Sequence, residues 1–318
     1  MEAFNIFIED AVYAVSDDYY ALMFKTKRLF FKMLKEHKSA EEFIKGTNKI
    51  WDKVDHTYME ATLKRFEKLV SQKNIDGHPI LDPNAEFQEI FKLTSEGRFE
   101  EVERKYKEAV NDYYSGRLKT INNDYIDDNT YLTNLVKKYD DVQATIPYYH
   151  ENGKIASYHN IADYNSMLYQ VNLVRSGWNR TMYDSKILEN DLVYLVPHPY
   201  ACEKCMQYQG RIYSVSGKTP GYPNKQTALD GGVGHPHCQH QFVIYWNKEQ
   251  LLSNNYDSDE WADKYKTKQK MKALDLKKKT LRNDLKIYKD IDNYDEVDKT
   301  KTRINVINKK IREFKKEL

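Results

Sequence analysis

Three cysteines and three histidines that could bind a metal ion are gathered in one short segment of the chain. Cys202 and Cys205 are separated by two residues, and the third cysteine, Cys238, follows downstream. A two-residue spacer lets two thiolates reach one ion from a tight turn, and Cys238 can supply a third sulfur. Thiolate and imidazole are ligands that suit Zn²⁺. The spacing therefore predicts a zinc site.

The fourth ligand is predicted to be a histidine near Cys238, where the sequence offers His235, His237 and His240. If Gln239 is extended, Cys238 and His240 point to the same side of the chain, which favours His240. His235 is the main alternative. Three thiolates and one imidazole fill all four tetrahedral positions and leave none for water or substrate. The predicted zinc ion is therefore structural.

Other interpretations of the cysteines remain open. A lone Cys-x-x-Cys is also the pattern of a redox pair. A thioredoxin-type pair begins a helix inside a βαβ unit, whereas Pro197, Pro199 and Gly210 predict a loop here. The simplest alternative is three small buried residues near surface histidines. The chain contains no GxGxxG, P-loop, HExxH or GxSxG motif, so the Cys/His segment is the candidate site.

The surrounding elements predict an α+β fold in three regions. Residues 1–145 show helical amphipathic spacing and are interpreted as a scaffold or docking region. One apolar stripe there consists of Tyr20, Met23, Phe24, Phe30, Phe31 and Leu34. Residues 146–250 predict a small α+β domain with a helix over 161–188 and strands over 192–196, 211–215 and 242–246. Zinc would clip the loops between these strands, since the domain has little core of its own.

The remaining region, 251–318, predicts a basic helical hairpin or coiled coil. Apolar residues keep a/d spacing on both sides of the segment 290–298. The whole chain is nearly balanced at 50 basic and 48 acidic residues, but Lys264 to Leu318 holds 19 Lys plus Arg against 9 Asp plus Glu. This surplus predicts salt-sensitive binding to DNA phosphate or to an acidic protein. A solvated coiled-coil face explains the pattern equally well.

Length and composition set limits on the class of protein. With 318 residues, 40% of them apolar, the chain is long enough for two or three folded units. It has no apolar run of 18 residues and no basic region in its first 16, so we expect neither a membrane span nor a secretory signal. Three cysteines cannot all pair with one another, which fits a reducing cytosol.

Motifs between Ile146 and Trp246 occur in an order that resembles a known family. They are Ile146-Pro-Tyr-Tyr, Gly153-Lys-Ile-Ala-Ser-Tyr158, Leu192-Val-Tyr-Leu-Val, Cys202-x-x-Cys205, Gln209-Gly-Arg-Ile-Tyr-Ser214 and Cys238-x-His240. This order is similar to that of the minor capsid proteins of tailed bacteriophages, of the minor capsid protein 2 type. Related Mu F-like head-morphogenesis proteins carry HPxC followed by Cys or His, which here is His235-Pro-His-Cys238-Gln-His240. Members often have Arg-Thr where this chain has Gln170-Val171, and many have His in place of Cys202, which favours interchangeable metal ligands.

The resemblance implies a structural, low-copy component of the virion that is synthesised in the bacterial host cytoplasm. It would lie inside the head near the portal and act in procapsid assembly and in genome packaging or delivery. The implied partners are portal and major capsid or scaffold proteins, with double-stranded DNA as a further partner of Lys264–Leu318, and no membrane. No reaction is implied, so the chain is expected not to be an enzyme.

Two other functions remain as alternatives. A phage-encoded zinc nuclease or toxin-like enzyme would use His198, His235 or His237 as general base, but four filled ligand positions argue against an open catalytic metal. An accessory DNA-binding protein that is not built into particles would rely on the basic tail.

Overall fold

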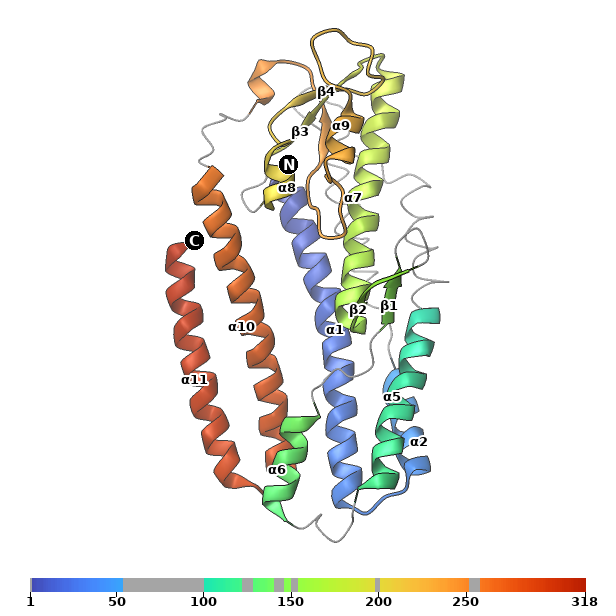
Figure 1. Cartoon of the computed structure of the whole chain (residues 1–318), viewed down its shortest axis with the longest axis vertical. Coiled ribbons are helices and arrows are strands. Elements are labelled where there is room, and N and C mark those ends of the chain that lie inside the picture. Colours follow the sequence, from blue (N-terminus) through green and yellow to red (C-terminus); the bar gives the residue numbers. More distant parts are fainter. Residues whose placement is uncertain are drawn as a thin grey trace. The chain divides into compact units, whose positions relative to one another are not determined.

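The computed structural model describes residues 2–53, 100–121, 128–139, 146–149, 154–197, 201–251 and 258–318. These parts are mostly helical, with two small antiparallel sheets (Figure 1). The helices are α1 (Glu2–Lys35), α2 (Ala40–Trp51), α5 (Glu100–Thr120), α6 (Asn129–Lys138), α7 (Ile161–Ile187), α8 (Glu203–Met206), α9 (Lys225–Asp230), η3 (Lys248–Gln250), α10 (Ser258–Asp290) and α11 (Tyr294–Glu317). The strands are β1 (Ile146–Tyr149), β2 (Ile155–His159), β3 (Leu192–Leu195), β4 (Ile212–Ser214) and β5 (Phe242–Ile244). The predicted general-base candidate His198 lies outside the described residues.

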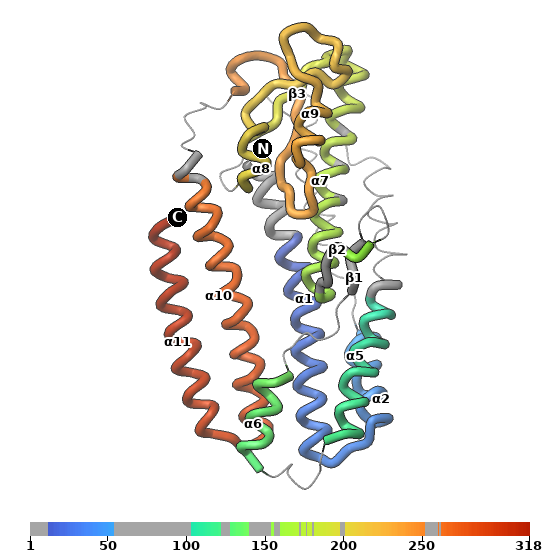
Figure 2. Tube along the Cα trace, in the orientation of Figure 1, coloured from blue at the N-terminus to red at the C-terminus, as the bar shows by residue number. Residues whose placement is uncertain are grey.

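The chain divides into two compact units, each assembled from separate stretches of sequence. Figure 2 colours the trace by residue number, so that these stretches can be followed along the chain. The described parts of the first unit are residues 2–15, 166–197, 201–251 and 258–268. Those of the second are residues 16–53, 100–121, 128–139, 146–149, 154–165 and 269–318. The sequence predicted domain boundaries near residues 145 and 250. These boundaries state which segments fold independently, and they stay a prediction.

The first unit contains a three-stranded antiparallel sheet in the order β4-β3-β5. Val193 of the central strand lies opposite Tyr213 on one side and Ile244 on the other. Val193 and Leu195 are fully buried, because β3 is an apolar run at the centre of the sheet. All three strands predicted for this region are present, each one or two residues shorter than expected at its ends.

Helix α7 fixes the chain that leads into β5. Three of its side chains donate hydrogen bonds to carbonyl oxygens there: Gln170 to Cys238 at 3.2 Å, Trp178 to His240 at 2.9 Å and Thr181 to Phe242 at 2.9 Å. The accepting residues alternate along the chain, because alternate carbonyls of an extended segment point to the same side. The other side of this segment pairs with β3, where the Val196 amide donates to the Gln241 carbonyl. The helix thus holds the chain around Cys238 and His240 in an extended conformation.

In the second unit, the apolar stripe predicted for α1 forms part of an aromatic core. Phe30 and Phe31 are fully buried, and Phe30 lies edge-on to Phe43 of α2 at a centroid distance of 6.1 Å. Helix α2 begins with a capping box in which Ser39 and Glu42 satisfy each other's backbone amides. These contacts confirm that the stripe serves as core.

The predicted C-terminal hairpin is present as α10 and α11, which run antiparallel and side by side (Figure 1). Asp292 adopts a left-handed φ of 56° in the turn between them, and Asn293 caps α11. Ion pairs connect α10 and the turn to α1. They join Lys27 to Asp284 at 2.9 Å, Arg28 to Asp290 at 2.5 Å and Lys35 to Asp292 at 2.5 Å.

Among the described helices, none combines the length and the apolar character needed to cross a membrane.

Candidate metal centre

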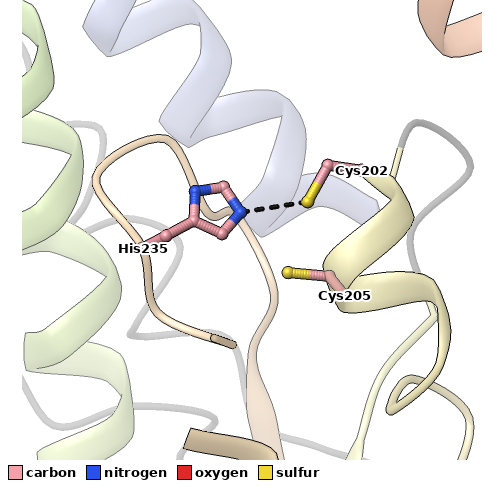
Figure 3. A group of neighbouring side chains, drawn as sticks. All are labelled: Cys202, Cys205 and His235. Carbon is pink, nitrogen blue, oxygen red and sulfur yellow. Dashed lines mark hydrogen bonds between the residues drawn. The ribbon is translucent and has the colours of Figure 1, made fainter. Parts of the chain in front are cut away.

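The Cys-x-x-Cys pair lies at the start of a one-turn helix. Cys202 is the N-cap of α8, and Cys205 lies within it, so that both thiols belong to one tight turn (Figure 3). The expectation of a loop at this pair was therefore wrong: the Pro and Gly residues that flank the segment leave room for a helix of four residues. The flanking strands β3 and β4 are antiparallel, so the thioredoxin-type βαβ arrangement is not formed here.

The second half of the centre comes from the loop between α9 and β5. Gly232 and Gly234 have left-handed φ values of 100° and 93°, which glycine adopts without strain. The turn that they make brings His235 and Cys238 toward α8. Here the glycines give the backbone room to turn toward the sulfurs.

The donor atoms form two overlapping groups of three. One comprises Cys202, Cys205 and His235, and the other comprises Cys205, Cys238 and His240. Within each group all ligand atoms lie within 4.8 Å of one another, and Cys205 belongs to both. The two groups are joined through Cys205, but the predicted set of Cys202, Cys205, Cys238 and His240 does not appear as a single group of four.

The distances inside the second group match those of a tetrahedral metal site. Sulfur ligands at about 2.3 Å and nitrogen ligands at about 2.0–2.1 Å from an ion lie about 3.8 Å apart when both are sulfur, and about 3.5 Å apart for sulfur and nitrogen. The two sulfurs of Cys205 and Cys238 are 3.9 Å apart, and Cys238 Sγ lies 3.5 Å from His240 Nδ1. All three residues of this group are buried.

The two histidines differ in the partner of their second nitrogen. His240 Nε2 lies 2.8 Å from Gln209 Oε1, an acceptor that keeps a proton on Nε2 and leaves the Nδ1 lone pair facing Cys238. His235 Nδ1 instead accepts from the backbone amide of His237 at 3.4 Å. Its Nε2 lies 3.1 Å from Cys202 Sγ, the contact drawn in Figure 3. In a neutral imidazole with this arrangement, His235 Nε2 carries the proton and donates it to the sulfur.

The three thiols share their protons unequally. Hydrogen bonds with Cys202 and Cys238, together with burial, raise the pKa of the Cys205 thiol. The pKa of Cys202 is lowered by its hydrogen bonds with Cys205 and His235. That of Cys238 is lowered by its hydrogen bonds with Cys205 and His240. A lowered thiol pKa favours the thiolate, which is the form that binds a divalent cation.

Sequence reasoning placed some of these residues correctly and missed others. Cys238 and His240 do face the same side, as predicted. His237 is exposed and belongs to neither donor group. Gln209, which orients His240, was part of a motif without an assigned role, since only the fold brings it to the imidazole ring.

Comparison with known proteins connects this geometry to a family. Residues 174–316 match the family described as phage minor capsid protein 2. This part of the chain is similar to phage minor capsid proteins. No curated protein and no solved structure matches the chain.

The minor capsid protein region begins within α7 and ends in the last turn of α11. It includes all five donor side chains and both helices of the C-terminal hairpin. The resemblance in the sequence was placed over 146–246, whereas the match begins at 174 and continues to 316. The motifs at 146–149 and 153–158 therefore lie outside the matched region, and the basic tail lies inside it. The family supports a structural role in the capsid, and hence a place in the virion, over catalysis.

Proposed function

We propose that this protein is a low-copy minor component of the phage head, located inside the capsid near the portal, that acts in procapsid assembly and genome packaging or delivery. The observation that carries the proposal is the minor capsid match over 174–316. Protein contacts with portal, major capsid or scaffold subunits would use the helical surfaces, since helices make up most of the described chain.

The Cys/His centre is proposed to bind one structural zinc ion. Its support is the combination of three sulfurs, two of them with lowered thiol pKa, and distances that fit tetrahedral edges. The centre joins α8 to the loop before β5, two segments 33 positions apart in the sequence. Cys205 and Cys238 already belong to a buried core with Val193, Leu195 and Phe242, so the expectation of a domain with little core was wrong. A tetrahedral ion would add a link between the two segments to that core.

Cys202, Cys205, Cys238 and His240 are the proposed ligands, and His235 is assigned a hydrogen bond to the Cys202 sulfur. Metal-bound histidines usually donate their other ring N–H to an acceptor, and Gln209 offers that acceptor to His240. His235 has its Nδ1 on an amide donor, which fits a ring that donates through Nε2. Binding of the ion would draw Cys202 toward the group formed by the other three ligands.

A complementation experiment tests the head-assembly role. A phage whose copy of this gene carries a stop codon is supplied with the wild-type protein, with Cys205→Ser or with His237→Ala, and DNA-filled heads are counted by electron microscopy. The wild type and His237→Ala are expected to restore filled heads, whereas Cys205→Ser is expected not to. Normal numbers of filled heads without any copy of the protein would contradict the proposal.

A further inference from the structure

The charge of the C-terminal hairpin is divided between its two ends. Residues 284–298, around the turn, contain six Asp and Glu and only two Lys. Residues 299–316 contain eight Lys and Arg and a single Glu. The end of the hairpin that lies away from the turn is therefore strongly basic on α11, and the turn end is acidic.

Four of the eight basic residues of α11 lie in a row along one side of the helix. At 100° per residue, five positions fall within an arc of about 100°. They are Lys301, Asn305, Lys309, Arg312 and Lys316, all exposed. The buried side chains of Thr300, Ile307 and Ile311 lie on another side of α11. The row is therefore available to a partner and spans about 22 Å at 1.5 Å per residue.

The last part of the row is not neutralised by acidic groups. Lys309, Arg312 and Lys316 form no ion pair within the described part of the chain, and Lys301 pairs only with its neighbour Asp298 at 2.8 Å. On α10, by contrast, Lys278 pairs with Asp275, and Lys279 pairs with Asp17 of α1. On α11, Lys299 and Arg303 lie outside the row and pair with Glu296, so most of the unpaired positive charge of this helix lies in the row.

The chemistry of the row distinguishes nucleic acid from protein as its partner. Protein interfaces place apolar and aromatic side chains at their centre. The row contains no apolar residue, and its one uncharged member is Asn305. Cations and amides along a line are the groups that contact phosphates. A stretch of 22 Å of double-stranded DNA presents about 13 phosphate charges to such a line.

We propose that the Lys309, Arg312 and Lys316 side of α11 binds the phosphate backbone of double-stranded DNA without sequence specificity. The inference rests on the proposed function, because a protein inside the head meets packaged DNA. The residues of the surface itself were identified from their charge and position alone. It narrows the DNA-contacting part of the tail from the whole segment 264–318 to one side of one helix.

The test is a salt titration of DNA binding by the full chain. Fluorescence anisotropy with a labelled 30-base-pair duplex of mixed sequence is measured from about 50 to 200 mM salt, a range over which phosphate contacts dominate the affinity. The test variant is Lys309→Gln with Arg312→Gln and Lys316→Gln. Each phosphate contact contributes about 0.9 to the slope of log K against log salt, so the slope should fall by about 2.7. Over a fourfold rise in salt the wild type should therefore lose about 40-fold more affinity than the variant.

A matched control is available on α10. Arg282, Lys286 and Lys289 are exposed, have the same kind of one-sided helical spacing and lie next to the acidic turn. Their triple replacement by Gln removes the same charge and should leave the slope within about one contact of the wild type. Equal losses in the two triple variants, or a wild type that does not bind the duplex at 50 mM salt, would overturn the proposal. So would complete competition by polyglutamate at equal charge, which would show an acidic protein to be the preferred partner.

Failure of this inference and failure of the proposed function are separable. Heads that contain the protein, together with an unchanged salt slope in the α11 variant, would remove the DNA surface and keep the capsid role. If the protein binds DNA through α11 but is absent from particles, the DNA surface is kept and the capsid role is removed. Circular dichroism checks that the variants keep their helices.

Discussion

Cys205 is the residue on which the two donor groups depend. It belongs to both groups of three, is fully buried, and its thiol pKa is raised because it makes hydrogen bonds with two sulfurs of lowered pKa. A divalent cation would replace the Cys205 proton and make all three sulfurs thiolates. The cluster is thus a site in which one side chain links two segments of the chain.

Metal content tests the ligand assignment. Wild-type protein purified without chelator is expected to contain about one zinc ion per chain by inductively coupled plasma mass spectrometry. Cys205→Ser and His240→Ala should lose most of it, because each removes a buried ligand. His235→Ala should retain it with weaker affinity, and His237→Ala should match the wild type.

Hydrogen exchange adds the structural consequence. Cys205→Ser should lose protection across residues 190–246, while α1 and α2 keep theirs. Retention of zinc by His240→Ala together with its loss from His235→Ala would exchange the roles of the two histidines. Two ions per chain in the wild type would contradict a single tetrahedral site.

The sequence could not predict which histidine binds the ion, and the reason is physical. The two-residue spacer constrains Cys202 and Cys205 to lie near each other. Cys238 was assigned to the same site because it is the one other cysteine of the chain and follows downstream. His235 and His240 lie at similar distances from Cys238 in the chain. The structure separates them by the sulfur that each ring contacts and by the partner of the second ring nitrogen, Gln209 for His240 and the His237 amide for His235. Those partners are set by tertiary structure.

Among the elements, the loop after β4 depends on a single carboxylate. Asp191 accepts hydrogen bonds from Ser214, Ser216 and Thr219, at distances between 2.5 and 2.9 Å. Burial alone would raise its pKa, but the hydrogen bonds from Ser214, Thr219 and Ser216 outweigh that effect and lower the pKa of Asp191 to about 2. The loop leads to α9, whose Ala228 packs in the same core as Cys205.

The lowered pKa of Asp191 predicts a pH-dependent contribution to stability. The stabilisation is complete above the unfolded pKa of about 3.9 and is lost as the pH falls toward 2, since the folded state then gives up its ionised form. At pH 7, Asp191→Asn should lower the free energy of unfolding by about 1–2 kcal/mol after allowance for solvent screening. Urea unfolding from pH 7 to pH 2.5 measures this. A difference between the two proteins that stays constant below pH 4 would contradict the assignment.

Helix α1 carries a buried charge whose partner lies far away in the sequence. The Lys27 side chain is 1% exposed and pairs with Asp284, 257 positions along the chain. Sequence patterns assign a lysine to a solvated face by default, so this pair could not be predicted. The apolar stripe of α1 was predictable, because helical spacing alone identifies it.

Loss of the Asp284 carboxylate should be costly. Asp284→Asn removes the carboxylate that pairs with the buried Lys27 ammonium group and should lower the free energy of unfolding by about 3 kcal/mol. Asp298→Asn, which removes the partner of exposed Lys301, is the matched control and should cost less than about 0.5 kcal/mol. Equal effects in the two variants, measured by urea unfolding, would mean that burial does not set the strength of the Lys27 pair.

For the molecule as a whole, the family and the hairpin are the two parts of the account that sequence and structure support together. The motif order resembled minor capsid proteins, and the family match extends from α7 through α11. The hairpin was predictable from its a/d spacing. The separation of its acidic turn from its basic end becomes clear only when the positions of α10, the turn and α11 are known. A count of charges over the whole tail adds the acidic turn to the basic end and therefore does not show that the two are separate.

The central claim is that this protein is a low-copy structural part of the phage head. Quantitative mass spectrometry of purified procapsids and mature particles, with the portal and major capsid proteins as internal standards, measures its copy number directly. The account predicts a few copies per portal in procapsids and in mature particles alike. Absence of the protein from both kinds of particle would contradict it.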